Sequence, residues 1–296
     1  MSHDEKIKTY VHSDNICLAA YHWGELTPEK ESIIFIHGYP DSAEVWNKLA
    51  ESLADEFNVI AYDVRGTGLS DIPAHSSEYD FKYLINDLEQ VIQAFSPHQP
   101  VHLVGHDWGA LQGWEAVLGD RLEDKIQSYT ALAPSLDHVG WWFKREWSKG
   151  SFQGYRNVIQ RGIGSGYMGI FQIPWIPELV WNLGLAQLWP KWVAKSENTE
   201  VQPDPKQLRN GVNGLGLYRQ NLIQALLHPT SRTTSIPIHM LVMTQDPFVP
   251  KHLSLGMGEW ASDIHYTQIE SGHWGILSHY AEISKKIRDY ILQLNS

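Results

Sequence analysis

Cysteine and long apolar segments are scarce in this chain. One cysteine, Cys17, stands among 296 residues, so the sequence excludes an internal disulfide framework and a cysteine-based metal site, and it fits a reducing compartment. No run of about 18 apolar residues occurs, and the N-terminus MSHDEKIKTY lacks the apolar core of a signal peptide. We therefore expect a cytoplasmic protein without membrane insertion.

Positive charge is also in short supply. Lysine and arginine number 23 against 34 aspartates and glutamates, which gives a formal net charge of −11. No basic cluster is dense enough to follow a phosphate backbone. We therefore expect neither nucleic acid nor an anionic membrane surface among the partners.

Short apolar runs alternate with helix-like segments along much of the chain. Six runs bounded by turn residues are typical of buried strands: 32–36, 58–62, 101–104, 126–132, 238–243 and 265–269. The helix-like segments are 43–54, 81–95, 111–118 and 276–294. This alternation predicts an α/β fold in which helices cover both faces of a mostly parallel sheet. Residues 9–11 and 16–23 predict an antiparallel ribbon at the sheet edge.

The alternation stops between residues 135 and 237. This stretch holds 7 of the 13 tryptophans: Trp141, Trp142, Trp147, Trp175, Trp181, Trp189 and Trp192. It has no clean strand pattern, so we predict a mostly helical lobe, 135–237, inserted into a core formed by 1–134 and 238–296. The glycines at 162–166 have no apolar strand before them and no Lys-Ser/Thr after them, which indicates a turn of the lobe rather than a phosphate loop.

The sequence G-H-D-W-G at 105–109 has the spacing of a nucleophile elbow, with aspartate where serine is usual. It follows the strand expected at 101–104 and precedes a helix-compatible segment, as the motif requires. A carboxylate attacks an sp³ carbon that bears a leaving group, whereas serine suits acyl transfer. Asp107 is therefore the candidate nucleophile. A plain helix N-cap is the alternative, and the neighbouring His106 is expected to pack on the sheet side.

Two further residues follow expected strands in the order nucleophile, acid, histidine. Asp246 comes directly after one strand, and His273 lies between the last strand and the C-terminal helix. Reactive groups gather at the carboxyl ends of parallel strands, so we expect both side chains to join Asp107 in an α/β-hydrolase triad. Asp137 is the fallback acid. Asp246 as a turn residue and His273 as an ordinary histidine are the alternatives.

The sequence H-G-Y-P at 37–40 follows the first apolar strand. Its Tyr39 can offer a backbone N–H to an oxyanion together with the N–H of Trp108, the residue after the nucleophile. A plain strand-exit turn is the alternative. Water activated by His273 would then hydrolyse an ester on Asp107. The expected substrate is an epoxide or an alkyl halide, and no metal or organic cofactor is required.

At these residues the chain resembles the epoxide hydrolases of the α/β-hydrolase fold. The motif at 37–40 is similar to their H-G-x-P, the motif at 105–109 to their elbow, and Asp246 and G-H-W at 272–274 to their acid and histidine positions. The resemblance covers nearly the whole chain. Haloalkane dehalogenases share these motifs, so the motifs indicate the mechanism more firmly than the substrate.

The resemblance also implies two lobe tyrosines that hydrogen-bond the epoxide oxygen. Tyr167 precedes a Phe-Gln pair as in the family, and Tyr218 stands in L-Y-R where the family has W-Y-R. Together with Trp108 they are the expected substrate-binding residues. Leu217, in place of the family's tryptophan, and Gly169 hint at a roomy pocket.

Dehalogenases are the rival with the same mechanism. They need halide donors, commonly Trp108 plus a second tryptophan or an asparagine. Tyr39 removes the asparagine version, but the tryptophan-rich lobe leaves a second tryptophan possible. Fluoroacetate dehalogenases instead carry arginine after the nucleophile. A non-catalytic ligand-binding homologue is the third alternative. The expectation is an epoxide hydrolase that acts on a small apolar epoxide with water, as a monomer or homodimer.

Overall fold

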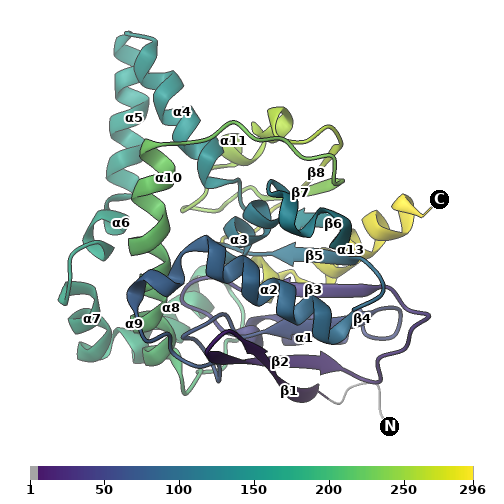
Figure 1. Ribbon diagram of the computed structural model, residues 1–296. Coiled ribbons are helices and arrows are strands. Elements are labelled where there is room, and N and C mark those ends of the chain that lie inside the picture. The colour runs from purple at the N-terminus through teal and green to yellow at the C-terminus, as the bar shows by residue number, and fades with distance from the viewer. Residues whose placement is uncertain (1–5, 296) are drawn as a thin grey trace.

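The computed structural model describes residues 6–295 and shows one eight-stranded sheet within that range (Figure 1). The strands are β1 (Lys6–Ser13), β2 (Ile16–Trp23), β3 (Ser32–Ile36), β4 (Asn58–Tyr62), β5 (Val101–Gly105), β6 (Ile126–Ala131), β7 (Ile238–Met243) and β8 (Ile264–Ile269). Their order is β1-β2-β4-β3-β5-β6-β7-β8. β1 and β2 form an antiparallel hairpin at the edge, β2 pairs antiparallel with β4, and the other neighbours are parallel. The predicted α/β fold is confirmed.

Alternate side chains of the central strands enter two separate cores. In β3, Ile34 and Ile36 belong to one core, whereas Ile33 and Phe35 belong to the other. Successive side chains of a strand point to opposite faces, so a run without polar interruption is stable only where both faces are covered. The continuous apolar runs of the sequence therefore reflect a sheet that is buried on both sides.

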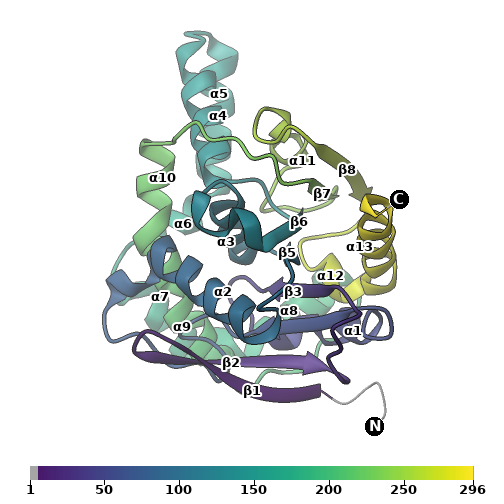
Figure 2. The same ribbon diagram turned by 45° about the vertical axis from the view of Figure 1, so that its right-hand side comes forward.

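Helices cover the two faces of the sheet (Figures 1 and 2). They are α2 (Phe81–Phe95) and α3 (Trp108–Val117) on one face, and α1 (Asn47–Glu51), α12 (Gly275–Ser278) and α13 (Tyr280–Leu294) on the other. In α13, Ile283, Ile287 and Ile291 recur at helical spacing and are all buried, which is the apolar stripe expected of a surface helix.

Three predicted helices differ in extent from those observed. Residues 43–54 divide into a 3₁₀ turn, Ala43–Trp46, and α1, which ends at Glu51. The 276–294 segment breaks at His279, where φ is −116° and ψ is 27° and where the Ser278 hydroxyl contacts both the His279 imidazole and Glu197. The helix predicted from 111 begins earlier, at Trp108, directly after the turn that carries Asp107.

The segment between β6 and β7 folds mainly into helices. They are α4 (Leu136–Ser148), α5 (Phe152–Gly164), α6 (Gly166–Phe171), α7 (Ile176–Val180), α8 (Ala186–Glu197), α9 (Gln207–Leu217) and α10 (Ile223–Leu227). The α4–α5 hairpin extends beyond the sheet, and α6 to α10 gather at one end of it (Figure 1). The turn predicted at 162–166 is confined to Ser165: Gly162 and Gly164 belong to the end of α5, and Gly166 begins α6. Residues 1–5 and 296 of the predicted core lie outside the described residues.

Among residues 6–295, no helix combines the length and the apolar character that a membrane crossing requires.

Candidate active site

Asp107 occupies a sharp turn between β5 and α3. Its φ of 52° and ψ of −122° lie in a region that residues with a side chain rarely adopt. A side chain at Gly105 would overlap the backbone of Gly109, and one at Gly109 would overlap the carbonyl oxygen of Ile36. The two glycines of the motif therefore allow the close strand–helix approach that holds the aspartate at the turn.

The Asp107 carboxylate faces the two predicted oxyanion donors. Its Oδ1 accepts a hydrogen bond of 2.7 Å from the Tyr39 backbone N–H, and the Trp108 backbone N–H also favours the charged form of the carboxylate. A side chain at Gly38 would overlap this carboxylate. Burial raises the pKa of Asp107, while His273 and the two N–H groups oppose that rise. The arrangement leaves Oδ2 directed to the histidine side.

His273 lies between the two predicted carboxylates. Its Nδ1 is 2.7 Å from Asp246 Oδ2, and its Nε2 is 3.7 Å from Asp107 Oδ2. Asp246 Oδ1 accepts hydrogen bonds from the backbone N–H groups of Phe248 at 2.7 Å and Val249 at 2.9 Å. Burial by itself would raise the pKa of Asp246, but the imidazole and these donors hold it below the ordinary value. Asp246 is thus set to remain an anion that orients the ring.

The protonation of His273 is controlled by the surrounding carboxylates. Burial by itself would lower the pKa of the imidazole, but Asp246, Asp107 and Asp41 raise it from 6.5 to about 9. A folded-state pKa above the unfolded value stabilises the fold below pH 6.5, and this stabilisation disappears as the pH rises through 9. At about 1.4 kcal/mol per pKa unit, the shift of His273 contributes roughly 3 kcal/mol.

We expect the unfolding free energy to show this dependence. Relative to His273→Gln, the stability of the unmodified protein should fall by roughly 3 kcal/mol between pH 6.5 and pH 9.5. Urea unfolding of both proteins over that range measures the difference. A difference that does not change with pH would show that the imidazole is not held charged in the fold.

His106 has the packing position expected for it. It is fully buried, its ring centre lies 4.7 Å from that of His273, and its Nε2 donates to the His273 carbonyl oxygen at 2.8 Å. Burial lowers the pKa of His106 to about 3. His106 is therefore a neutral ring that supports the main chain of His273.

The fallback acid, Asp137, is engaged elsewhere. Its carboxylate accepts hydrogen bonds from the backbone and hydroxyl of Thr230 and forms an ion pair of 2.6 Å with Arg232. The same arginine pairs with Glu115 on α3. Asp137 thus joins the start of α4 to the segment before β7, away from His273.

The two predicted tyrosines lie beside Asp107. Tyr218 begins the π-helical turn Tyr218–Leu222 and is buried, with its ring centre 4.7 Å from that of Trp108. The two rings meet edge to face, with an interplanar angle of 69°. Tyr167, on α6, contacts Phe248 edge-on at 5.8 Å. Burial, followed by the Asp107 charge, raises the pKa of both phenols, so both carry protons that they can donate.

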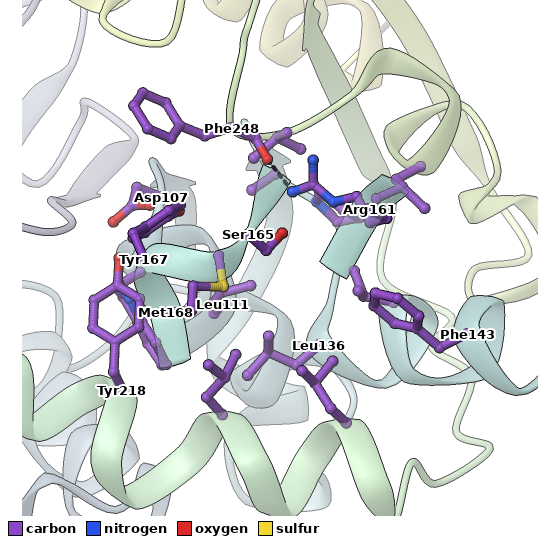
Figure 3. Close-up of a pocket in the computed structure, with 18 of the residues that line it drawn as sticks. Asp107, Leu111, Leu136, Phe143, Arg161, Ser165, Tyr167, Met168, Tyr218 and Phe248 are labelled. Carbon is purple, nitrogen blue, oxygen red and sulfur yellow. Dashed lines mark hydrogen bonds between the residues drawn. The ribbon is translucent and has the colours of Figure 1, made fainter. Parts of the chain in front are cut away.

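These groups share an apolar cavity of about 280 Å³ (Figure 3). Its lining is Asp107, Trp108, Leu111, Ala133, Pro134, Leu136, Val139, Phe143, Arg161, Gly162, Ser165, Tyr167, Met168, Gly169, Tyr218, Leu222, Ile223, Leu226, Phe248, Val249 and Leu253. Gly169 has open space where a side chain would begin, as its small size suggested. Leu217 is buried and does not line the cavity, so its effect on the size of the pocket stays a prediction.

Glu197, at the end of α8, was not anticipated from the sequence. Its Oε1 accepts a hydrogen bond of 3.0 Å from the Trp274 backbone N–H, and its Oε2 accepts one of 3.2 Å from Ser278. Gly272 leaves room for this carboxylate, because a side chain there would overlap it. A single glutamate in a helical lobe carries no sequence signal of such a contact. Through these two hydrogen bonds Glu197 connects the lobe to the segment that carries His273.

Removal of this contact should loosen the loop. Glu197→Ala leaves the buried Trp274 N–H without a partner, and we expect a loss of about 1–3 kcal/mol in the free energy of unfolding. Urea unfolding measures this loss, with the exposed Glu200→Ala as the matched control. Equal stability of the two variants would contradict a fastening contact.

Three kinds of comparison place this geometry among known proteins. The family described as the alpha/beta hydrolase fold matches residues 31–280. The probable oxidoreductase EphD of Mycobacterium tuberculosis is 26% identical over 290 residues, which cover 94% of this chain and 48% of that protein. Epoxide hydrolase srdG of Neurospora crassa is 24% identical over 339 residues, which cover 98% of this chain and 97% of that protein. Thus the chain spans about half the length of EphD but nearly all of srdG.

Solved structures agree with the family match. The Bacillus megaterium epoxide hydrolase in complex with an inhibitor superposes with a TM-score of 0.77 at 22% identity, and covers 96% of this chain and 99% of that chain. Epoxide hydrolase A from Mycobacterium thermoresistibile superposes with a TM-score of 0.75 at 20% identity, and covers 97% of this chain and 98% of that chain. The family match extends over most of the sequence and agrees with the sheet order and the elbow, and the chain therefore belongs to the α/β-hydrolase-fold family.

Proposed function

We propose that the protein is an epoxide hydrolase that converts an epoxide to a vicinal diol through an ester on Asp107. The observation that carries this proposal is the meeting of one carboxylate and two protonated phenols, Tyr167 and Tyr218, in one apolar cavity. The carboxylate supplies the nucleophile, and the phenols supply the proton that an opening epoxide needs. The relatives named epoxide hydrolase favour the same activity.

The first step is ring opening. Oδ1 of Asp107 is held by the Tyr39 N–H, so Oδ2 attacks an epoxide carbon and forms the new C–O bond. The C–O bond of the ring breaks, and its electron pair becomes an alkoxide. Tyr167 or Tyr218 then transfers its phenolic proton to that oxygen. The products of this step are a hydroxyalkyl ester of Asp107 and a phenolate.

The second step is hydrolysis of the ester. Esterification removes the Asp107 charge, which is one of the charges that raise the pKa of His273, so the imidazolium releases its proton to solvent more readily and the neutral ring can act as a base. It takes a proton from water, which attacks the Asp107 carbonyl carbon, while Asp246 stabilises the imidazolium. The Tyr39 and Trp108 N–H groups hold the oxyanion. Collapse releases the diol, His273 protonates the leaving oxygen, and the remaining proton returns to the phenolate.

The helical segment 135–237 fits the role of a cap over this chemistry. It supplies both tyrosines, and the core, 1–134 and 238–296, supplies Asp107, Asp246 and His273. The cavity between them has an apolar lining, which keeps bulk water from the charged groups and strengthens their interactions. Division into a catalytic core and a cap is therefore part of the proposal.

The dehalogenase alternative is less well supported by the lining of the cavity. A halide site commonly needs the indole N–H of Trp108 together with a second tryptophan or an asparagine. Among the described residues that line the cavity, Trp108 is the one tryptophan and there is no asparagine. This lining favours an epoxide over an alkyl halide.

Single-turnover labelling tests the proposal. Excess enzyme and an epoxide are mixed in ¹⁸O-water, the diol is quantified, and peptides are examined by mass spectrometry; halide release from alkyl halides is assayed in parallel. We expect diol and ¹⁸O in Asp107, with little halide. Halide release with labelled Asp107 but no diol would assign the dehalogenase reaction, and turnover without label in Asp107 would refute the ester.

The largest effect of the tyrosines should be on ring opening. Tyr167→Phe and Tyr218→Phe are each expected to slow alkylation by about 10- to 100-fold, and the double variant by about 10³-fold or more, because one phenol can substitute for the other. Rapid-quench measurement of ester formation tests this. The exposed Tyr155→Phe on α5 is the control, and unchanged alkylation in the double variant would exclude phenol donors.

A further inference from the structure

One basic residue, Arg161, lies among the residues that line the cavity within the described range. It is near the end of α5, and Ser165 follows it in the turn to α6. Figure 3 shows Arg161 on the side of the cavity away from Asp107 and Tyr167, with Ser165 between. The cavity therefore carries the nucleophile at one side and a positive charge at the other.

The guanidinium of Arg161 has spare capacity for an anion. It donates to the carbonyl oxygen of Phe248, and none of the ion pairs found among residues 6–295 includes it. A guanidinium has five N–H donors. The bond to the Phe248 carbonyl uses one of them and leaves the positive charge of Arg161 unpaired. Partial burial lowers the pKa of Arg161, while Tyr167 and Asp246 act in the opposite direction. A half-buried charge without a carboxylate at ion-pair distance is costly, and an anionic ligand would offset that cost.

The rest of the lining separates the two charged ends. Between them the wall consists mainly of aliphatic and aromatic side chains, among them Leu111, Leu136, Val139, Met168 and Leu226. Such a surface suits a hydrocarbon segment and offers few polar partners. A ligand that fits the whole cavity has a reactive group at one end, an apolar middle, and a negative charge at the other end.

We propose that Arg161, assisted by the Ser165 hydroxyl, binds the carboxylate of an epoxide-bearing carboxylic acid and orients the epoxide toward Asp107. The epoxide at the Asp107 end of this ligand rests on the proposed function, whereas the carboxylate at the Arg161 end does not. Arginine pairs with carboxylates through two parallel hydrogen bonds, so the contact fixes direction as well as affinity. Arg161 is thus a specificity-determining residue.

Matched ligands and variants test the proposal. The substrates are an epoxy fatty acid and its methyl ester, which differ only in the charge at the far end. Arg161→Met should lower kcat/KM for the acid by about 10- to 100-fold, mainly through KM, and leave the ester within about twofold. The control is Arg156→Met, an exposed position on the same helix with the same loss of charge. Equal losses for acid and ester would overturn the proposal, because they would indicate general damage through the Phe248 contact.

Binding without chemistry separates this proposal from the proposed function. The saturated acid of the same length and its methyl ester are titrated into the unmodified protein by isothermal calorimetry. Preference for the acid by about tenfold or more, lost in Arg161→Met and partly kept in Arg161→Lys, supports the arginine site even if no epoxide is hydrolysed. Equal affinities of the unmodified protein for acid and ester would overturn it, even if epoxides are hydrolysed and even if the variants fail to fold.

Discussion

Replacement of His273 by glutamine is expected to stop the cycle at the alkyl-enzyme ester. Asp107 can still attack an epoxide, because Oδ2 and both phenols remain, but no base is left to activate water. Turnover should fall by about 10³- to 10⁴-fold, while one equivalent of substrate becomes attached to the protein. Intact-mass spectrometry should show an increase equal to the mass of the epoxide, and peptide mapping should place it on Asp107.

The glutamine variant is informative because its amide can still donate to Asp246, as His273 Nδ1 does at 2.7 Å. His98→Gln, at an exposed position, is the control for the substitution itself. Loss of turnover without an adduct would mean that His273 is needed before the ester forms. Full turnover would remove it from the mechanism.

Replacement of Asp107 by asparagine is expected to abolish both steps. The amide oxygen can still accept from the Tyr39 N–H, and asparagine tolerates positive φ better than most residues. The neutral amide is not a nucleophile toward an epoxide, so we expect activity to fall by about 10⁴-fold or more with no adduct. Initial rates of diol formation and intact-mass spectrometry measure the two effects.

Two comparisons separate chemistry from folding in this variant. Asp124→Asn, at an exposed position, should retain full activity. The pKa of His273 should also fall in Asp107→Asn, because the variant lacks one of the carboxylates that raise it; titration of the imidazole by NMR measures this. Residual activity above one per cent would show that another group can open the epoxide.

The central strands and the elbow could be predicted because their signals are local. A strand buried on both faces needs an unbroken apolar run, and β3, β4 and β7 lie at the predicted residues. The elbow needs glycine at Gly105 and Gly109, because a side chain at either position would overlap the backbone of a neighbouring segment. Each requirement restricts the residue types within one short segment, so it leaves a readable pattern.

The extent of several helices was less predictable because it depends on distant contacts. The break at His279 accompanies a bond of Ser278 to Glu197, which lies 81 residues earlier. No local pattern distinguishes this serine from one inside a continuous helix. Tertiary contacts therefore decided where the C-terminal helix divides.

The sequence by itself determined the fold class and the candidate triad, because apolar periodicity and the order of polar residues after strands are properties of the chain. Only the tertiary structure decided which groups meet. It set His273 between Asp107 and Asp246, committed Asp137 to Arg232, and brought the charge of Arg161 to the cavity wall. The physical reason is that helices of the lobe carry weak local signals, and their faces are chosen by packing against a core far away in sequence.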